Sequence, residues 1–183
     1  MEWKIVETEY LVKHPPFFTA RRDKCIRPDG VEIPAYYVVE LPQAALTVGI
    51  TTEGKVLMVK QYRHPVSKVS LEFPGGFIEA GEDPLTAAQR EMEEETGYHF
   101  EQFEYLGTVA ANPGILNNFS HLFIAYGGRK AGEQQQDPQE DIRLELLTIS
   151  ELKDKLLHHE IIQSLHVNAC FYALLKMGEL QLK

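Results

Sequence analysis

Polar and apolar residues alternate along the first forty or so residues of the chain. The segment from Lys4 to Val12 shows this alternation, and turn signals interrupt it at Pro15-Pro16, Pro28-Asp29-Gly30 and Pro42. A period of two is typical of strands with one buried face, and Pro and Gly mark the turns between strands. The segment from Lys4 to about Val39 is therefore predicted to form three antiparallel strands in a meander.

Two more continuously apolar runs follow, from Ala44 to Ile50 and from Val56 to Tyr62. Such runs are typical of strands that are buried on both faces. Between them, Glu53-Gly54 predicts a short hairpin turn. Further strands are expected at residues 103–110, 121–126 and 142–147, with a polar loop rich in Gln and Gly over residues 127–141.

Helical spacing of apolar residues distinguishes three other segments. The first is predicted to run from Pro84 to Thr96 and to end at Gly97. Ser150 is a good N-cap for a second helix, and a third is expected from about Ile161 to Met177. Strands before, between and after helices predict an α/β fold with a mixed sheet over residues 43–183, with residues 1–42 as an N-terminal β-meander.

Composition and charge narrow the classes of function. The 183 residues, 44% of them hydrophobic, suit one domain or a core with a small appendage. A net charge of −9 without a basic run argues against nucleic acid as a partner, because that binding depends on neutralising many phosphates. Two distant cysteines, no apolar leader and no apolar stretch of roughly 18–20 residues predict a cytoplasmic protein that does not contact a membrane.

Three glutamates share one face of the helix predicted at 84–96. At about 100° per residue, Glu91, Glu94 and Glu95 lie within an arc of about 100°, whereas Glu93 points away. Carboxylates beside the Gly75-Gly76 turn are suitable ligands for Mg²⁺, which takes oxygen ligands and shares itself with substrate phosphates. Glycine lets a backbone carbonyl approach the same ion. A solvated acidic face is the alternative interpretation of this run.

Arg90 is placed to organise these carboxylates. It lies one turn before Glu94 and can also reach back to Glu82, so that it could hold both side chains in position.

Nine residues at fixed spacing in this region match every defined position of the Nudix box. They are Gly76, Glu82, Arg90, Glu91, Met92, Glu94, Glu95, Gly97 and Tyr98. The chain therefore resembles the Nudix hydrolases, and its order of elements resembles their α/β/α sandwich. The resemblance implies a Mg²⁺ (or Mn²⁺) site made by Glu91, Glu95, Glu94 and the Gly75 carbonyl, with Glu82 and Arg90 as structural members of the box. Bound metal would neutralise a diphosphate and acidify an attacking water.

Three features outside the box resemble the ADP-ribose pyrophosphatase branch of that family. The first is Gln61-Tyr62-Arg63 leading to Leu71-Glu72-Phe73-Pro74. It implies that Arg63 and Glu72 bind substrate, since Arg63 could form paired bonds to a phosphate or ribose. A surface arginine paired with a nearby carboxylate is the alternative. The second feature is Pro113, fifteen residues past Tyr98, and the resemblance implies that it is a further substrate contact.

The third feature is the late segment Gln139-Glu140-Asp141. The resemblance implies that Glu140 binds metal or acts as the general base, from a loop that could close over the substrate. Residue 138 is Pro where some relatives have a second glutamate, so Asp137 or Asp141 could take this role instead.

The resemblance also implies a homodimer in which the N-terminal strands are exchanged between subunits and help to bind adenine. Phe17 is the candidate for stacking on the base, although packing in a core or an interface is the alternative.

The expected activity is hydrolysis of the pyrophosphate bond of ADP-ribose or another ADP-sugar to AMP and a sugar phosphate. GDP-mannose, NADH and dinucleoside polyphosphates are alternative substrates. A non-catalytic nucleotide sensor with the same fold is disfavoured because the box is intact, and a P-loop enzyme because its phosphate-binding motif is missing.

Overall fold

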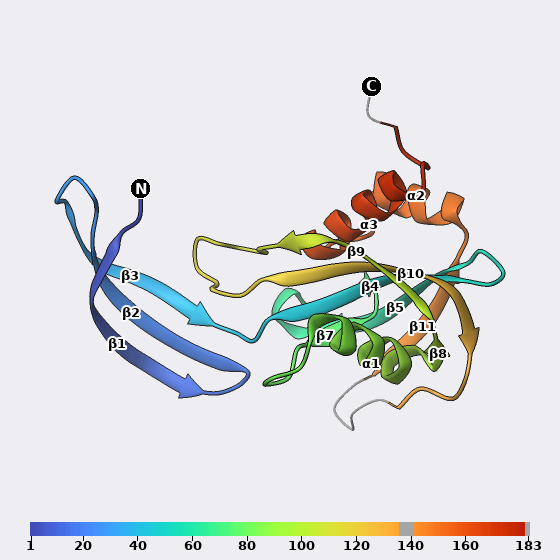
Figure 1. The fold of residues 1–183 in the computed structure, drawn as a ribbon, viewed down its shortest axis with the longest axis horizontal. Helices are drawn as coiled ribbons and strands as arrows, with labels where there is room; N and C mark the ends of the chain where they lie inside the picture. The colour runs from blue at the N-terminus through green and yellow to red at the C-terminus, as the bar shows by residue number, and fades with distance from the viewer. Residues whose placement is uncertain (136–140, 182–183) are drawn as a thin grey trace. The chain divides into compact units, whose positions relative to one another are not determined.

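A computed structural model describes residues 1–135 and 141–181 and divides the chain into two compact units (Figure 1). The first unit consists of Met1–Gln43 and Ala110–Phe119, and the second of Ala44–Val109 and Ser120–Lys183. The first unit thus includes ten residues that, in the sequence, separate two parts of the second unit. None of the helices in the described part of the chain is long and apolar enough to cross a membrane.

The first unit is an antiparallel sheet in the order β1-β2-β3, as the alternating pattern predicts. Its strands are β1 (Lys4–His14), β2 (Phe18–Ile26) and β3 (Glu32–Glu40). Segment 110–119 is held against β3, where the Val39 N–H donates to the Ile115 carbonyl at 2.8 Å and the Leu41 N–H donates to the Asn117 side chain at 3.1 Å.

The second unit is an eight-stranded mixed sheet with helices on both faces. Its strands are β4 (Ala44–Thr51), β5 (Val56–Arg63), β6 (Lys68–Glu72), β7 (Gly75–Phe77), β8 (Tyr98–His99), β9 (Gln102–Val109), β10 (Ser120–Lys130) and β11 (Ile142–Leu147). Its helices are α1 (Pro84–Thr96), α2 (Ile149–Leu157) and α3 (Ser164–Lys176), with a 3-10 turn at His64–Val66. The central order is β11-β5-β4-β10-β8, and β4 and β10 run parallel.

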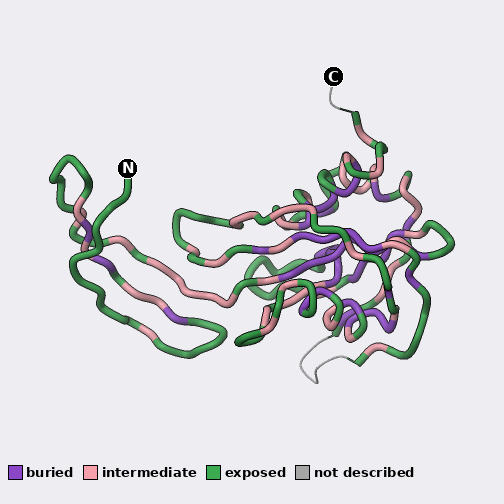
Figure 2. Tube along the Cα trace, viewed as in Figure 1, coloured by how far each residue is buried: buried purple, intermediate pink, exposed green. Residues whose placement is uncertain are grey.

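Side chains of the central strands alternate between two helical layers. Leu46 and Val48 of β4 belong to the core cluster that contains Ala169 and Leu174 of α3, whereas Ala45 packs with Ala87 and Ala88 of α1. Figure 1 shows α1 on one face of the sheet and α2 and α3 on the other, and Figure 2 shows the buried positions concentrated along these strands. The α/β/α sandwich with a mixed sheet and an N-terminal β-meander is confirmed.

Strands β4 and β5 pair with each other over two residue pairs only, Gly49 with Leu57 and Ile50 with Val56. Beyond these pairs β5 is bonded to β6 and β4 to β7. The connection between β6 and β7 follows the same path, and the Pro74 carbonyl accepts the Thr47 N–H at 2.9 Å. Residues 72–76 are therefore led into the interior of the sheet rather than over its surface.

Strand β10 extends to Lys130, so the expected loop at 127–141 was wrong over its first four residues. The glycines that indicated a loop are instead part of a bulge between Tyr126 and Gly128. A Cβ atom at Gly128 would approach the Phe100 ring to 2.2 Å, so glycine allows this ring to pack against the strand.

The N-cap of the second helix was also predicted at the wrong residue. Thr148, rather than Ser150, caps α2, and its side chain accepts the Glu151 N–H at 3.1 Å. The Glu151 carboxylate accepts the Thr148 N–H at 2.7 Å, which completes a capping box. The third helix begins at Ser164, three residues later than expected, and Ile161 is buried in the core before the helix starts.

Candidate active site

Helix α1 has the predicted bounds because strong local signals stop it at both ends. The Asp83 carboxylate accepts the Leu85 N–H at 2.9 Å, and Pro84 occupies the first turn, where no N–H is needed. Gly97 ends the helix in the left-handed region at φ 70°. The buried side of the helix includes Ala87, Ala88 and Met92. This packing fixes the rotation of the helix and hence the direction of its glutamates.

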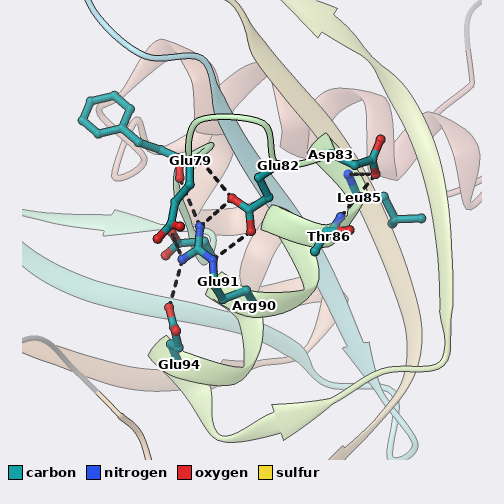
Figure 3. A network of polar contacts seen from close by, with 9 residues as sticks. Glu79, Glu82, Asp83, Leu85, Thr86, Arg90, Glu91 and Glu94 are labelled. Atoms are coloured by element: carbon teal, nitrogen blue, oxygen red, sulfur yellow. Dashed lines mark hydrogen bonds and ion pairs between the residues drawn. The ribbon is translucent and has the colours of Figure 1, made fainter. Parts of the chain in front are cut away.

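Arg90 is bonded to three carboxylates, as Figure 3 shows. Its Nε and Nη2 donate to the two oxygens of Glu82 at 3.0 and 3.1 Å. Its Nη1 donates to Glu91 at 2.7 Å and to Glu94 at 3.0 Å. Nη2 also donates to the Phe77 carbonyl at 3.2 Å, a contact that sequence reasoning missed. The hydrogen bond from Arg90 lowers the pKa of Glu82, and these carboxylates raise the pKa of Arg90, with Glu82 the main cause.

Glu93 lies outside this network, as its helical position predicts. Its carboxylate pairs with the His99 ring, and both side chains are more than half exposed. Glu93 can therefore serve as a control position for the other glutamates of α1.

Gly75 and Gly76, expected in a turn, are instead the first two residues of strand β7, which lies against α1. The Gly75 N–H donates to Glu95 at 2.8 Å, and Glu95 is only 7% exposed. A Cβ atom at Gly76 would lie 2.5 Å from one carboxylate oxygen of Glu91 and 2.7 Å from the other. At Gly75 a Cβ atom would lie 2.3 Å from the Ala45 carbonyl oxygen. Only glycine leaves room for the carboxylate and the strand at these two positions.

The carboxylates of Glu91, Glu94 and Glu95 have the hard oxygen donors that Mg²⁺ prefers, and the Glu91 carboxylate packs closely over Gly76. Within residues 1–135 and 141–181, no three acidic, His or Cys side chains are arranged to hold one ion by themselves. Mg²⁺ generally takes one or two carboxylates and completes its coordination with water and substrate phosphates. Glu91, Glu94 and Glu95 would thus offer carboxylate oxygens to an ion that also binds substrate phosphates.

Arg63 and Glu72, predicted to bind substrate, form a forked ion pair. Arg63 Nε donates to one oxygen of Glu72 at 2.9 Å, and Nη2 donates to the other at 2.5 Å. The Glu72 side chain is 3% exposed, whereas that of Arg63 is 44% exposed. Burial alone would raise the pKa of Glu72, but hydrogen bonds from Arg63 and His166 outweigh burial and hold that pKa well below its usual range. The alternative of a paired arginine is thus realised, although the pair still presents a cation at the surface.

His166 is a member of this cluster that sequence reasoning missed. It lies in α3, is 5% exposed and contacts both Glu72 and the backbone of Phe73. Its position on the buried face of a helix gave no sign of such a partner, since 93 residues separate it from Phe73.

The remaining predicted residues are not brought to this cluster by the described structure. Phe17 is 72% exposed and Pro113 is exposed, and both belong to the first unit, so their contact with substrate stays a prediction. Glu140 and Asp137 lie outside the described residues. Asp141 is exposed beside Arg143, with Nε and Oδ1 3.5 Å apart.

Comparison with known proteins identifies the family of this chain. The model of the NUDIX domain family matches residues 40–166, and that of the nucleoside diphosphate sugar hydrolase N-terminal domain matches residues 3–39. The chain is 37% identical to a methanol dehydrogenase activator of Bacillus methanolicus, over 90% of this chain and 91% of that protein. It is 34% identical to an ADP-ribose pyrophosphatase of Bacillus subtilis, over 65% of this chain and 63% of that protein.

Among solved structures, an ADP compounds hydrolase superposes with a TM-score of 0.83 at 19% identity, over 98% of each chain, which supports the fold. The chain therefore belongs to the Nudix family and is a Nudix hydrolase. Within that family it falls in the ADP-ribose pyrophosphatase-like branch.

Proposed function

We propose that the chain hydrolyses the pyrophosphate bond of ADP-ribose or another ADP-sugar, with Mg²⁺ (or Mn²⁺) as cofactor, to give AMP and a sugar phosphate. The observation that carries the proposal is the Arg90 network, which gathers Glu82, Glu91 and Glu94 beside the Gly75-Glu95 contact. Helix α1 and the glycines of β7 are thereby held close to four carboxylates. All four belong to the box that defines the family.

Each residue in this network has a separate task in the proposed reaction. Glu91, Glu94, Glu95 and the Gly75 carbonyl would hold the metal, which supplies charge neutralisation and a water of lowered pKa. Arg90 orients the carboxylates of Glu91 and Glu94, because its planar guanidinium donates hydrogen bonds to both. Glu140 is the proposed general base, with Asp137 and Asp141 as the alternatives.

Glu82 anchors Arg90 from the loop before α1. Both oxygens of Glu82 accept from Arg90, and one also accepts the Glu79 N–H at 2.9 Å. This paired arrangement sets the plane of the guanidinium before any metal or substrate is bound.

The choice of an ADP-sugar is supported by the names of relatives and by features outside the box. One relative is named as an ADP-ribose pyrophosphatase, and the N-terminal family model is named for nucleoside diphosphate sugar hydrolases. Arg63 remains 44% exposed beside a buried carboxylate, as a cation that meets a phosphate or ribose would be. Phe17 and Pro113 are proposed as further substrate contacts.

A panel assay tests this proposal. Purified chain with Mg²⁺ is offered ADP-ribose, ADP-glucose, GDP-mannose, NADH and diadenosine polyphosphates, and released AMP or GMP is measured. We expect AMP from an ADP-sugar at the highest kcat/KM. Release of GMP alone, or no turnover of any ADP-sugar, would show that the substrate assignment is wrong.

Two matched variants test the metal assignment. Glu95→Gln keeps an oxygen that can accept the Gly75 N–H but removes the charge, and we expect turnover to fall by about 100-fold or more. Glu93→Gln is the control on the same helix, because Glu93 faces His99 and should keep normal turnover. Equal rates for the two variants at saturating Mg²⁺ would contradict the assignment.

We also propose a homodimer formed through the N-terminal strands and a cytoplasmic location. Exposed apolar side chains on these strands support the dimer, among them Ile5, Val6, Tyr10, Leu11 and Phe18. Both cysteines are buried free thiols, which suits a reducing compartment.

A second candidate function is activation of an alcohol dehydrogenase. It is supported by the 37% identity, over 90% of this chain, to a protein named as a methanol dehydrogenase activator. The chain would be added to a methanol dehydrogenase, and the rate compared with that for Glu95→Gln. Activation that is lost in the variant would tie it to hydrolysis, whereas activation that persists would indicate binding. No activation would exclude this candidate.

A further inference from the structure

His166 contacts Glu72 and Phe73 from the helical layer that lies opposite α1. It belongs to α3, which packs on the face of the sheet away from α1. Its Nδ1 accepts the Phe73 N–H at 3.0 Å, and its Nε2 lies 3.3 Å from a carboxylate oxygen of Glu72. The opening between β4 and β5, where β6 leads into β7, is the place where such a side chain can meet both residues.

These two contacts determine the protonation of the ring. Because Nδ1 accepts a hydrogen bond from a backbone N–H, it carries no proton. The single ring proton therefore lies on Nε2 and points at Glu72. In this state both nitrogens of the ring, which is 5% exposed, have hydrogen-bond partners. In the other tautomer the Nδ1–H would face the Phe73 N–H, and two donors would meet.

Glu72 is thereby held from two sides. Arg63 contacts both carboxylate oxygens from the surface side, and His166 contacts one of them from the interior. An ion pair in which one partner is 44% exposed can exchange geometries at the surface. A third, buried contact on the carboxylate limits that motion and so restricts the guanidinium.

We propose that His166, as its neutral Nε2–H tautomer, is a positioning residue that fixes Arg63 through Glu72 for binding of the substrate's phosphate or ribose. The inference rests on the proposed function insofar as Arg63 contacts substrate. The same ring holds the Phe73 N–H, two residues before Gly75, whose own N–H donates to Glu95. One side chain of α3 thus contacts both the partner of Arg63 and the backbone that leads to Gly75.

His166→Asn separates these two contacts. The Asn amide oxygen lies near the place of Nδ1 and can still accept the Phe73 N–H, but the shorter side chain does not reach Glu72. We expect KM for ADP-ribose, and its Kd measured by calorimetry, to rise by roughly 10-fold, with a smaller change in kcat. His166→Gln, which can extend an N–H toward Glu72, should restore part of the affinity. His158→Asn, at an exposed histidine, is the control.

A double-mutant cycle distinguishes positioning from general stability. If His166 acts through Arg63, His166→Asn has no further effect on Kd in an Arg63→Ala background. The same 10-fold loss in both backgrounds would overturn the proposal, because it would show an effect that does not pass through Arg63. Unchanged Kd and KM in the single variant would overturn it as well.

Nitrogen NMR of the wild-type imidazole tests the tautomer without any substitution. The expected spectrum shows an unprotonated Nδ1 and a protonated Nε2 for His166, and a proton on Nδ1 would contradict the proposal. This measurement and the calorimetry with ADP-ribose do not require turnover. A chain that binds ADP-ribose through Arg63 but does not hydrolyse it would refute the proposed function and leave this inference intact.

Discussion

Arg90 joins a local helix pattern to the proposed metal site. Its bonds to Glu82 use two parallel donors, and its bonds to Glu91 and Glu94 share the remaining Nη1. A lysine ammonium carries the same charge but has no planar fork. Arg90 therefore contributes the planar geometry of its guanidinium in addition to its charge.

Arg90→Lys should lower turnover by about 10- to 100-fold and raise the Mg²⁺ concentration needed for half-maximal rate, because Glu91 and Glu94 lose their orientation. Steady-state kinetics at several Mg²⁺ concentrations measures both effects. Arg27→Lys, at an exposed pair with Asp29, is the control and should behave as the wild type. A variant with wild-type rates would show that Arg90 is dispensable.

Glu72 should make stability depend on pH. Its folded-state pKa lies below the usual value of 4.5, so the ionised carboxylate stabilises the folded chain above about pH 4.5. As the pH falls below that value, the unfolded chain binds a proton first and this contribution is progressively lost. Urea unfolding of wild type and Glu72→Gln should therefore differ most at neutral pH and converge in acid. A difference that grew on acidification would have the wrong sign.

At the scale of elements, local signals predicted α1 to the residue. Pro84 and Gly97 act on backbone groups within one turn, so the ends of the helix could be expected without knowing the fold, although the Asp83 cap was not recognised. The start of α2 was wrong because Thr148 and Ser150 are both acceptable caps in isolation. Thr148 alone also matches the capping box, with Glu151 three residues later.

Thr148→Ala should destabilise the chain by about 1 kcal/mol, because it removes the acceptor for the Glu151 N–H. Ser150→Ala, in the first turn of the same helix, should change stability by less than about 0.5 kcal/mol. Chemical denaturation of both variants checks the pair. A larger loss for Ser150→Ala would return the cap to the residue expected from sequence.

Gly76→Ala should disturb the contact between β7 and the Glu91 side chain of α1. The added Cβ would lie 2.5 to 2.7 Å from the Glu91 carboxylate, which must move away. We expect turnover to fall by about 100-fold with little change in unfolding temperature. Gly132→Ala is the matched control, because a Cβ there meets no heavy atom within 4 Å. Normal turnover in Gly76→Ala would mean that the position of Glu91 does not matter.

At the scale of the whole molecule, the strands of the first unit expose apolar side chains that a monomer would leave in water. Sedimentation should give twice the mass of one chain if these strands form the proposed dimer. Leu11→Glu places a charge on β1 and should yield monomers, whereas Lys4→Glu on the same strand should not. A monomeric wild type would refute the proposed dimer.

Much of the catalytic geometry could be predicted from sequence because it is local. Glu82, Arg90 and Glu94 lie within 13 residues, and helical spacing together with the length of an arginine side chain brings them within reach. Gly75 and Gly76 were recognised as a place of close approach, although they form strand β7 rather than a turn. The contact of Gly75 with Glu95 required the packing of α1 against β7.

The amino-acid sequence by itself determined the period of each main element, the caps of α1 and the set of glutamates on one helical face. These features depend on neighbours within one or two turns. Only the tertiary structure decided the split between β4 and β5, the bulge at Gly128 and the contact of His166 with Glu72. Each of these depends on which distant segment fills a space in the core, and the local pattern of a sequence carries no record of that partner.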